Sequence, residues 1–131
     1  MIFVDANVPM YLVGSPHPNQ DRARATLNRL RLAQERLVTD VESYQEILHR
    51  FTAIRRPADI DSAFYRLDEI VDEVFSYGMP EIHIARDLIS SLPELSARDA
   101  LHAAVMRRNG ISRILSYDAG FDAIPGVERM E

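Results

Sequence analysis

The chain contains no cysteine, and this absence excludes disulfide bonds, thiolate metal sites and cysteine nucleophiles together. It also has no apolar run approaching the eighteen or so residues of a membrane span. The opening residues, Met1 to Asp5, carry no charged leader and no cleavage site, so secretion is not expected. At 131 residues, we expect a single domain covering residues 1–131 and located in the cytoplasm.

Lysine is missing as well, because all fifteen basic residues are arginine. Walker-type nucleotide binding and Schiff-base catalysis both require a lysine, and so do receiver domains, which match this chain in size and also carry acidic pockets. A net charge of −5 argues against a protein that coats duplex nucleic acid with a basic face. It does not exclude a nuclease, because two divalent ions in an acidic pocket would nearly cancel that surplus where a phosphate must approach.

Short apolar runs alternate with helical patterns along the chain. Strands are predicted at 2–4, 37–39 and 113–117, with a possible edge strand at 127–130. Helices are predicted at 7–13, 19–36, 43–54, from about 60 to 74, at 80–91 and from 97 to about 109, while 74–77 fits either a helix end or a short strand. This alternation is typical of an α/β fold with a parallel sheet covered on both faces.

Acidic residues stand at the ends of three predicted strands: Asp5, Asp40 and Asp118. The carboxyl ends of parallel strands open onto one shared crevice, so acids at those ends converge there. Carboxylates crowded into one crevice are costly unless a cation sits among them. The pattern therefore predicts a metal site.

Each candidate acid also has a purely structural explanation. Asp5 could cap the following helix, although Asn7 could do so instead, and Asp118 before Ala119-Gly120 suits a tight turn. Glu46 could form an exposed ion pair with Arg50, while Glu42 lies one turn earlier on the same side.

The candidate residues in and after the helix that follows Leu95 also have structural alternatives. Asp99 could complete a capping box with Ser96. His102, beside small alanines, reads as a packed residue rather than a metal ligand. Asp122, four residues after Asp118, could reach the same pocket.

Four segments together resemble the PIN-domain nucleases, specifically the VapC-type toxins of bacterial and archaeal toxin-antitoxin operons. They are Met1-Ile2-Phe3-Val4-Asp5-Ala6-Asn7, Val38-Thr39 with Glu46-Ile47-Leu48, Ser96-Ala97-Arg98-Asp99-Ala100-Leu101-His102-Ala103-Ala104, and Ile114-Leu115-Ser116-Tyr117-Asp118-Ala119-Gly120-Phe121-Asp122. The resemblance implies a PIN-like three-layer fold around a central parallel sheet of about four to five strands. It also implies a catalytic quartet of Asp5, Glu46, Asp99 and Asp118, in which Asp5, Asp99 and Asp118 bind the metal.

The same resemblance assigns supporting positions and partners. Asp122 would be an auxiliary acid, and Asn7 and Ser116 would support the site by hydrogen bonding, Ser116 standing where the family usually has threonine. The implied activity is a Mg²⁺-dependent endoribonuclease, with Mn²⁺ as an alternative, since hard oxygen ligands select these ions over zinc. The implied partners are an RNA substrate, a cognate VapB-type antitoxin and a second copy of the chain in a homodimer.

Two other functions compete with this interpretation. A degenerate PIN-like fold could serve as a non-catalytic protein-interaction module, but all four family acids are present. A phosphatase of the haloacid dehalogenase type would need an Asp-x-Asp opening, which is Asp5-Ala6-Asn7 here, and a catalytic lysine.

An acidic protein that binds RNA must hold its phosphates with local arginine clusters. The arginines nearest in sequence to the site acids are Arg50, Arg55, Arg56 and Arg98, with Arg22 and Arg24 as more remote candidates. The alternative for each is a solvated helix face.

Overall fold

The computed structural model describes residues 1–131 and contains one five-stranded sheet in the order β3-β2-β1-β4-β5. All four neighbouring pairs are parallel. The strands are β1 (Ile2–Val4), β2 (Leu37–Asp40), β3 (Glu73–Phe75), β4 (Arg113–Leu115) and β5 (Glu128–Met130). A parallel sheet with β1 at its centre confirms the predicted fold class and places the ends of β2, β1 and β4 side by side.

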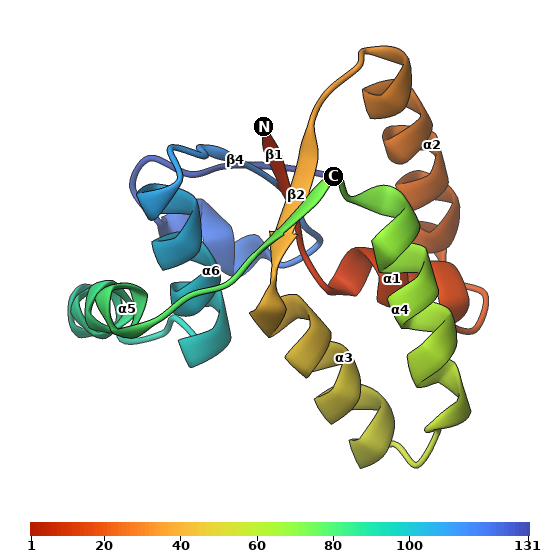
Figure 1. The fold of residues 1–131 in the computed structure, drawn as a ribbon, viewed down its shortest axis with the longest axis horizontal. Coiled ribbons are helices and arrows are strands. Elements are labelled where there is room, and N and C mark those ends of the chain that lie inside the picture. Colours follow the sequence, from red (N-terminus) through yellow and green to blue (C-terminus); the bar gives the residue numbers. More distant parts are fainter.

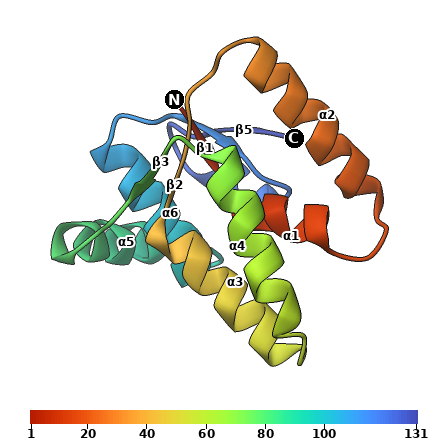
Figure 2. The same ribbon diagram turned by 45° about the vertical axis from the view of Figure 1, so that its right-hand side comes forward.

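Six α-helices and one 3₁₀ helix connect the strands (Figures 1 and 2). They are α1 (Asn7–Val13), α2 (Pro18–Leu32), α3 (Val41–Ala53), α4 (Ala58–Ile70), α5 (Met79–Ser91), α6 (Ala97–Arg108) and η1 (Ala119–Ala123). In Figure 1, α5 and α6 lie on one side of the strands, and α1, α2 and α4 lie on the other.

The core is correspondingly split into two apolar clusters by the sheet. Ile2 and Val4 of β1 pack with side chains of α1, α2, α3 and α4, whereas Phe3 packs with α5, α6 and η1. Because successive side chains of a strand point to opposite faces, one three-residue strand serves both clusters. This arrangement is the predicted three-layer architecture.

Two predicted helices end earlier than their apolar patterns suggested. Helix α2 ends at Leu32, which is 87% exposed, and Gln34 then adopts a positive φ of 56°, which no helix continues through. Helix α4 ends at Ile70, so Val74 belongs to β3 instead. Asp72 explains this change, because its N–H donates to the carbonyl of Leu37 (2.7 Å) and its carboxylate accepts from the Leu37 N–H (3.0 Å), which starts pairing with β2.

The C-terminal third follows the predicted pattern with small shifts. Helix α6 ends just before Asn109, and Gly110 takes the left-handed φ of 67° that a glycine tolerates there. Strand β4 ends at Leu115, two residues before the predicted end at Tyr117. Ser116 follows it, and η1 begins at Ala119. Across the whole chain, the helices are too short or too polar to cross a bilayer.

Candidate active site

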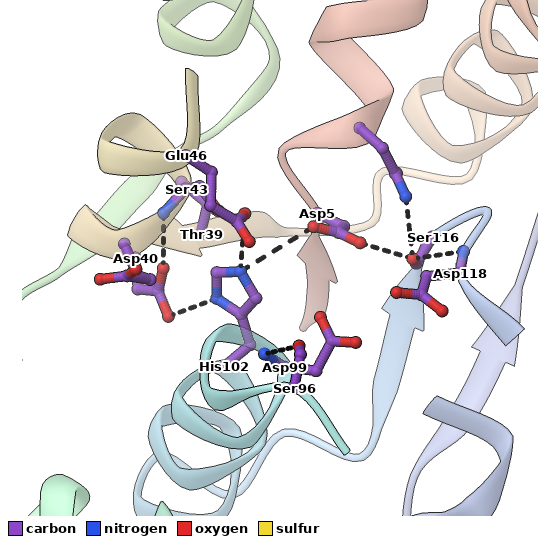
Figure 3. Close-up of polar contacts among 12 residues, drawn as sticks. Asp5, Thr39, Asp40, Ser43, Glu46, Ser96, Asp99, His102, Ser116 and Asp118 are labelled. Atoms are coloured by element: carbon purple, nitrogen blue, oxygen red, sulfur yellow. Dashed lines mark hydrogen bonds and ion pairs between the residues drawn. The ribbon is translucent and has the colours of Figure 1, made fainter. Parts of the chain in front are cut away.

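Asp5 follows β1 directly and lies at the centre of the carboxyl edge of the sheet (Figure 3). Its N–H continues the pairing with β4 by donating to the carbonyl of Leu115 (3.1 Å), so its position is set by the sheet. Its carboxylate is buried and accepts a 2.6 Å hydrogen bond from the hydroxyl of Ser116. Burial raises the pKa of Asp5 to about 6, with the charge of Glu46 adding to the shift and that of His102 opposing it.

The Ser116 hydroxyl connects several groups of this edge. Besides donating to Asp5, its oxygen accepts from the side-chain amide of Asn7 (3.3 Å) and from the N–H of Asp118 (3.0 Å). The Asn7 side-chain oxygen accepts from the N–H of Tyr117 (3.5 Å). Asn7 therefore does not cap α1, whose N-cap is Ala6 without a side-chain hydrogen bond, and neither does the Asp5 carboxylate.

Asp99 and Asp118 form a second pair of acids beside Asp5. The Ser96 hydroxyl accepts from the Asp99 N–H (3.1 Å), so Ser96 caps α6 as predicted. The Asp99 side chain does not reach back to complete a capping box and instead faces Asp118. Burial, followed by the hydrogen bond and negative charge of Asp118, raises the pKa of Asp99 to about 8.

Gly120 lies next to both Asp118 and Asp99. Its N–H donates to Oδ1 of Asp118 (2.8 Å), which forms the predicted turn. A Cβ at position 120 would lie 3.0 Å from Oδ1 of Asp118 and 3.5 Å from Oδ2 of Asp99. A side chain here would make an ordinary contact with Asp99 but would require the Asp118 carboxylate to shift by a few tenths of an ångström, so glycine favours the observed position of Asp118.

Glu46 is held by a buried histidine rather than by Arg50. Nε2 of His102 lies 3.1 Å from Oε2 of Glu46 and 3.9 Å from Oδ1 of Asp5, and Nδ1 lies 2.8 Å from Oδ2 of Asp40 (Figure 3). Burial lowers the pKa of His102, but the charge and hydrogen bond of Asp40, together with Glu46 and Asp5, outweigh it and hold the pKa well above its usual range. The Glu46–Arg50 ion pair, the structural alternative for Glu46, is not formed.

The Asp40–His102 contact was missed in the sequence, which indicated only that His102 is packed. The imidazole is indeed fully buried, with Phe3 at a ring-centroid distance of 5.1 Å. Asp40 caps α3 by accepting from the Ser43 N–H (3.0 Å) and also faces the histidine. Its position at the end of β2, close to that of Asp5 directly after β1, was the available signal.

The carboxylates line one open cavity of about 410 Å³. Its walls come from the end of β1, the start of α1, helix α3, the start of α6 and the loop after β4; the lining includes Asp5, Asn7, Glu46, His49, Arg50, Arg98, Asp99 and Asp118. Asp5, Glu46 and His102 offer ligand atoms within 4.8 Å of one another. Both ring nitrogens of His102 already face carboxylates, so the oxygens of Asp5, Glu46, Asp99 and Asp118 are the better donors for a hard cation.

The other candidate residues are distributed differently. Glu42 points elsewhere and accepts from the Tyr77 hydroxyl (2.7 Å). Asp122 does not line the cavity, because its two oxygens accept from Arg129 at 2.9 and 3.1 Å. The prediction that Asp122 could reach the same pocket as Asp118 is therefore wrong.

The arginines divide into two groups. Arg50 and Arg98 line the cavity and form no ion pair. Arg56 pairs with Asp59 (2.7 Å), and Arg55 is exposed with a positive φ of 58° just beyond α3. The remote candidates pair with acids far from the cavity, Arg22 with Glu131 (4.0 Å) and Arg24 with Asp21 (3.3 Å).

Comparison with known proteins defines the class to which this fold and acidic cavity belong. The PIN domain family model matches residues 2–127. The chain belongs to the PIN-domain family.

Within that family the most informative relatives are ribonucleases. The chain is 47% identical over 130 residues to ribonuclease VapC13 of Mycobacterium tuberculosis, covering 99% of both chains. It is 40% identical over 118 residues to ribonuclease VapC23 of the same species, covering 90% of this chain and 93% of the relative.

Solved structures agree with the fold. VapC20 of M. tuberculosis, described as a toxin that cleaves the sarcin-ricin loop, matches with a TM-score of 0.76 at 22% identity over 94% of both chains. The VapBC2 complex of Rickettsia felis, bound to a DNA fragment from its promoter, matches with a TM-score of 0.75 at 13% identity over 100% of both chains.

Proposed function

We propose that this chain is a Mg²⁺-dependent endoribonuclease of the VapC type, with Mn²⁺ able to replace Mg²⁺, and that it acts as the toxin of a toxin-antitoxin pair in the cytoplasm. The observation that carries the proposal is the meeting of Asp5, Glu46, Asp99 and Asp118 in one cavity, although they come from four separate parts of the chain. Burial raises the pKa values of Asp5 and Asp99, and the charges of Glu46 and Asp118 add to the two shifts. Excess carboxylates in a cleft favour a bound cation.

The residues would divide the work as follows. Asp5, Asp99 and Asp118 would hold the cation, and Ser116 and Asn7 would orient Asp5 through the hydroxyl that bonds its carboxylate. Glu46 would be kept in position by His102, itself anchored on Asp40.

The reaction needs a nucleophile and charge neutralisation at the phosphate. When bound, a divalent cation supplies a water of lowered pKa and offsets the charge that develops on the phosphate oxygens. Arg50 and Arg98, which have no carboxylate partner in the cavity wall, would hold the flanking RNA phosphates. The chain itself provides no covalent nucleophile in this scheme.

The comparisons support a protein partner. Similar solved structures include a toxin-antitoxin complex from Klebsiella pneumoniae and VapBC-1 from Haemophilus influenzae. A VapB-type antitoxin that covers the acidic cavity would keep the nuclease inactive, and its release would inhibit translation and growth. A homodimer completes the proposed assembly.

RNA cleavage by the purified chain tests this function. We expect cleavage of total cellular RNA with Mg²⁺ or Mn²⁺, none with EDTA, and a loss of several orders of magnitude in Asp99→Asn, which removes charge that the cation needs while keeping side-chain size. The matched control is Asp87→Asn, an exposed position on α5 that pairs only with Arg86. Equal cleavage by wild type and Asp99→Asn would refute the proposal, and absence of cleavage in a folded wild type would favour the non-catalytic interaction module.

A further inference from the structure

A second cleft of about 440 Å³ adjoins the acidic cavity and shares Asn7, Met10 and Arg50 with it. Its other walls are the end of α1, the loop of Gly14 to His17, Phe51 near the end of α3, and Ile54 and Arg56 just beyond that helix. The lining is therefore mixed, because it combines apolar and aromatic side chains with polar ones and includes two arginines. The volume of the cleft falls within the range that is typical of small-ligand sites.

Two aromatic rings stand together in this wall. Tyr11 and His17 lie with ring centroids 4.8 Å apart and an interplanar angle of 36°, and Tyr117 makes an edge contact with Tyr11 at a centroid distance of 5.4 Å. His17 is exposed and lines the cleft, so a ligand in the cleft can reach it. Aromatic rings of this kind bind unpaired nucleobases by stacking.

The loop that carries His17 is held in place before any ligand arrives. The side-chain amide of Gln20 lies within hydrogen-bond distance of three carbonyls, those of Tyr11 (3.2 Å), Leu12 (3.3 Å) and Gly14 (3.4 Å). Nδ1 of His17 accepts from the Asn19 N–H (3.0 Å) and so caps α2. A preformed cleft binds with less loss of conformational entropy than a mobile loop.

Arg50 connects the two cavities chemically. It lines both of them and has no acidic partner, so its guanidinium is free to meet a phosphate at the boundary. Arg56, in contrast, is already paired with Asp59 (2.7 Å). An RNA strand with its scissile phosphate at the acids would have its next nucleotide beside Arg50, at the mouth of the aromatic cleft.

We propose that this cleft is a nucleotide subsite, in which the base adjacent to the scissile phosphate stacks on His17 and Tyr11 while Arg50 contacts its phosphate. The inference rests on the proposed ribonuclease function. It adds a source of substrate selectivity, because only RNA that can unstack one base next to the cleavage point would fit.

Two substitutions of His17 separate stacking from helix capping. His17→Asn keeps an acceptor that caps α2 but removes the ring, whereas His17→Tyr keeps a ring and removes the capping nitrogen. The matched control is His83→Asn, an exposed histidine on α5 outside both cavities.

The assay is equilibrium binding of a fluorescein-labelled single-stranded RNA octamer, with Ca²⁺ in place of Mg²⁺ to suppress cleavage. We expect about tenfold weaker binding for His17→Asn and near wild-type binding for His17→Tyr and His83→Asn, as the loss of one base stack predicts. In NMR titrations, nucleoside monophosphates should shift the His17 ring signals, whereas ribose 5-phosphate should not.

Other results would overturn the subsite. Equal RNA binding by wild type and His17→Asn would do so, and so would a loss confined to His17→Tyr, which would indicate capping alone. If His17→Asn weakens antitoxin binding but not RNA binding, the cleft belongs to the protein partner. Each of these results leaves RNA cleavage by the wild type intact, whereas failure of the proposed function would appear as a wild type that neither binds nor cleaves RNA.

Discussion

Replacing Asp5 with asparagine should stabilise the protein in the absence of metal while removing its response to metal. The structure raises the pKa of Asp5 from an ordinary 3.8 to about 6, mainly by burial. Each pKa unit corresponds to about 1.4 kcal/mol, so keeping this carboxylate ionised costs the folded state roughly 3 kcal/mol. Asparagine avoids that cost and still offers an oxygen to the Ser116 hydroxyl.

The sign and the pH window follow from which state holds the proton. Between pH 3.8 and about 6 the unfolded chain loses the Asp5 proton before the folded chain does, so stability falls as pH rises through this window and the full cost is present above it. Asp99, with a pKa of about 8, extends the decline to higher pH. The gain from Asp5→Asn should therefore be largest at pH 8 and small near pH 4.

Calorimetry with EDTA measures this directly. For a chain of 131 residues, one kcal/mol corresponds to about 3 to 5 °C, so we expect Asp5→Asn to melt up to roughly 10 °C above wild type at pH 8. Millimolar Mg²⁺ or Mn²⁺ should raise the midpoint of wild type but not that of the variant, because only a bound ligand stabilises by mass action. An Asp5→Asn midpoint at or below wild type at pH 8, or a wild-type midpoint indifferent to metal, would refute the reasoning.

Three further predictions concern neighbouring residues. Glu46→Gln should lose RNA cleavage by orders of magnitude in a cleavage assay, whereas Glu42→Gln should stay active, because Glu42 bonds Tyr77 outside the cavity; the reverse result would move the functional acid one turn along α3. His102→Asn should weaken Mn²⁺ binding by about 10- to 100-fold in isothermal titration, as loss of an outer-sphere partner does, and an unchanged affinity would limit the histidine to packing. Arg50→Ala and Arg98→Ala should each lower the slope of log RNA affinity against log salt by about 0.7 in filter binding with Ca²⁺, whereas Arg24→Ala, paired with Asp21, should leave it unaltered.

The sequence predicted that the acids at the strand ends lie together, because the signal for each acid is its position next to its own strand. Asp5 and Asp118 each follow an apolar strand, and parallel strands bring such ends together whatever their separation along the chain. The Ser96 cap of α6 and the glycine after Asn109 are also short-range signals, and the structure contains both. Each of these signals depends only on residues that are neighbours in the sequence.

Contacts between distant elements could not be predicted in the same way. His102 meets Asp40 across 62 positions, and no pattern around either residue specifies the partner. Glu46, and not Glu42, faces the cavity because of the way α3 lies on the sheet. The spacing of the two acids along the helix does not determine this, and the choice of Glu46 came from the family resemblance. Arg129 can donate to Asp122 because β5 pairs with β4. The sequence indicated β5 only as a possible edge strand. The end of α4 likewise depends on a contact between distant residues, in which the Leu37 N–H donates to the Asp72 carboxylate.

The central claim is that these acids support hydrolysis of RNA by a metal-activated water. The most direct measurement is mass spectrometry of the cleavage products formed in ¹⁸O-labelled water with Mn²⁺. The account predicts one ¹⁸O atom in the new terminal phosphate, no 2′,3′-cyclic phosphate, and no product for wild type with EDTA or for Asp99→Asn with Mn²⁺. Cyclic phosphate ends would show attack by the neighbouring 2′-hydroxyl, and cleavage that persists in EDTA would show that no metal is needed. Either result would contradict the account.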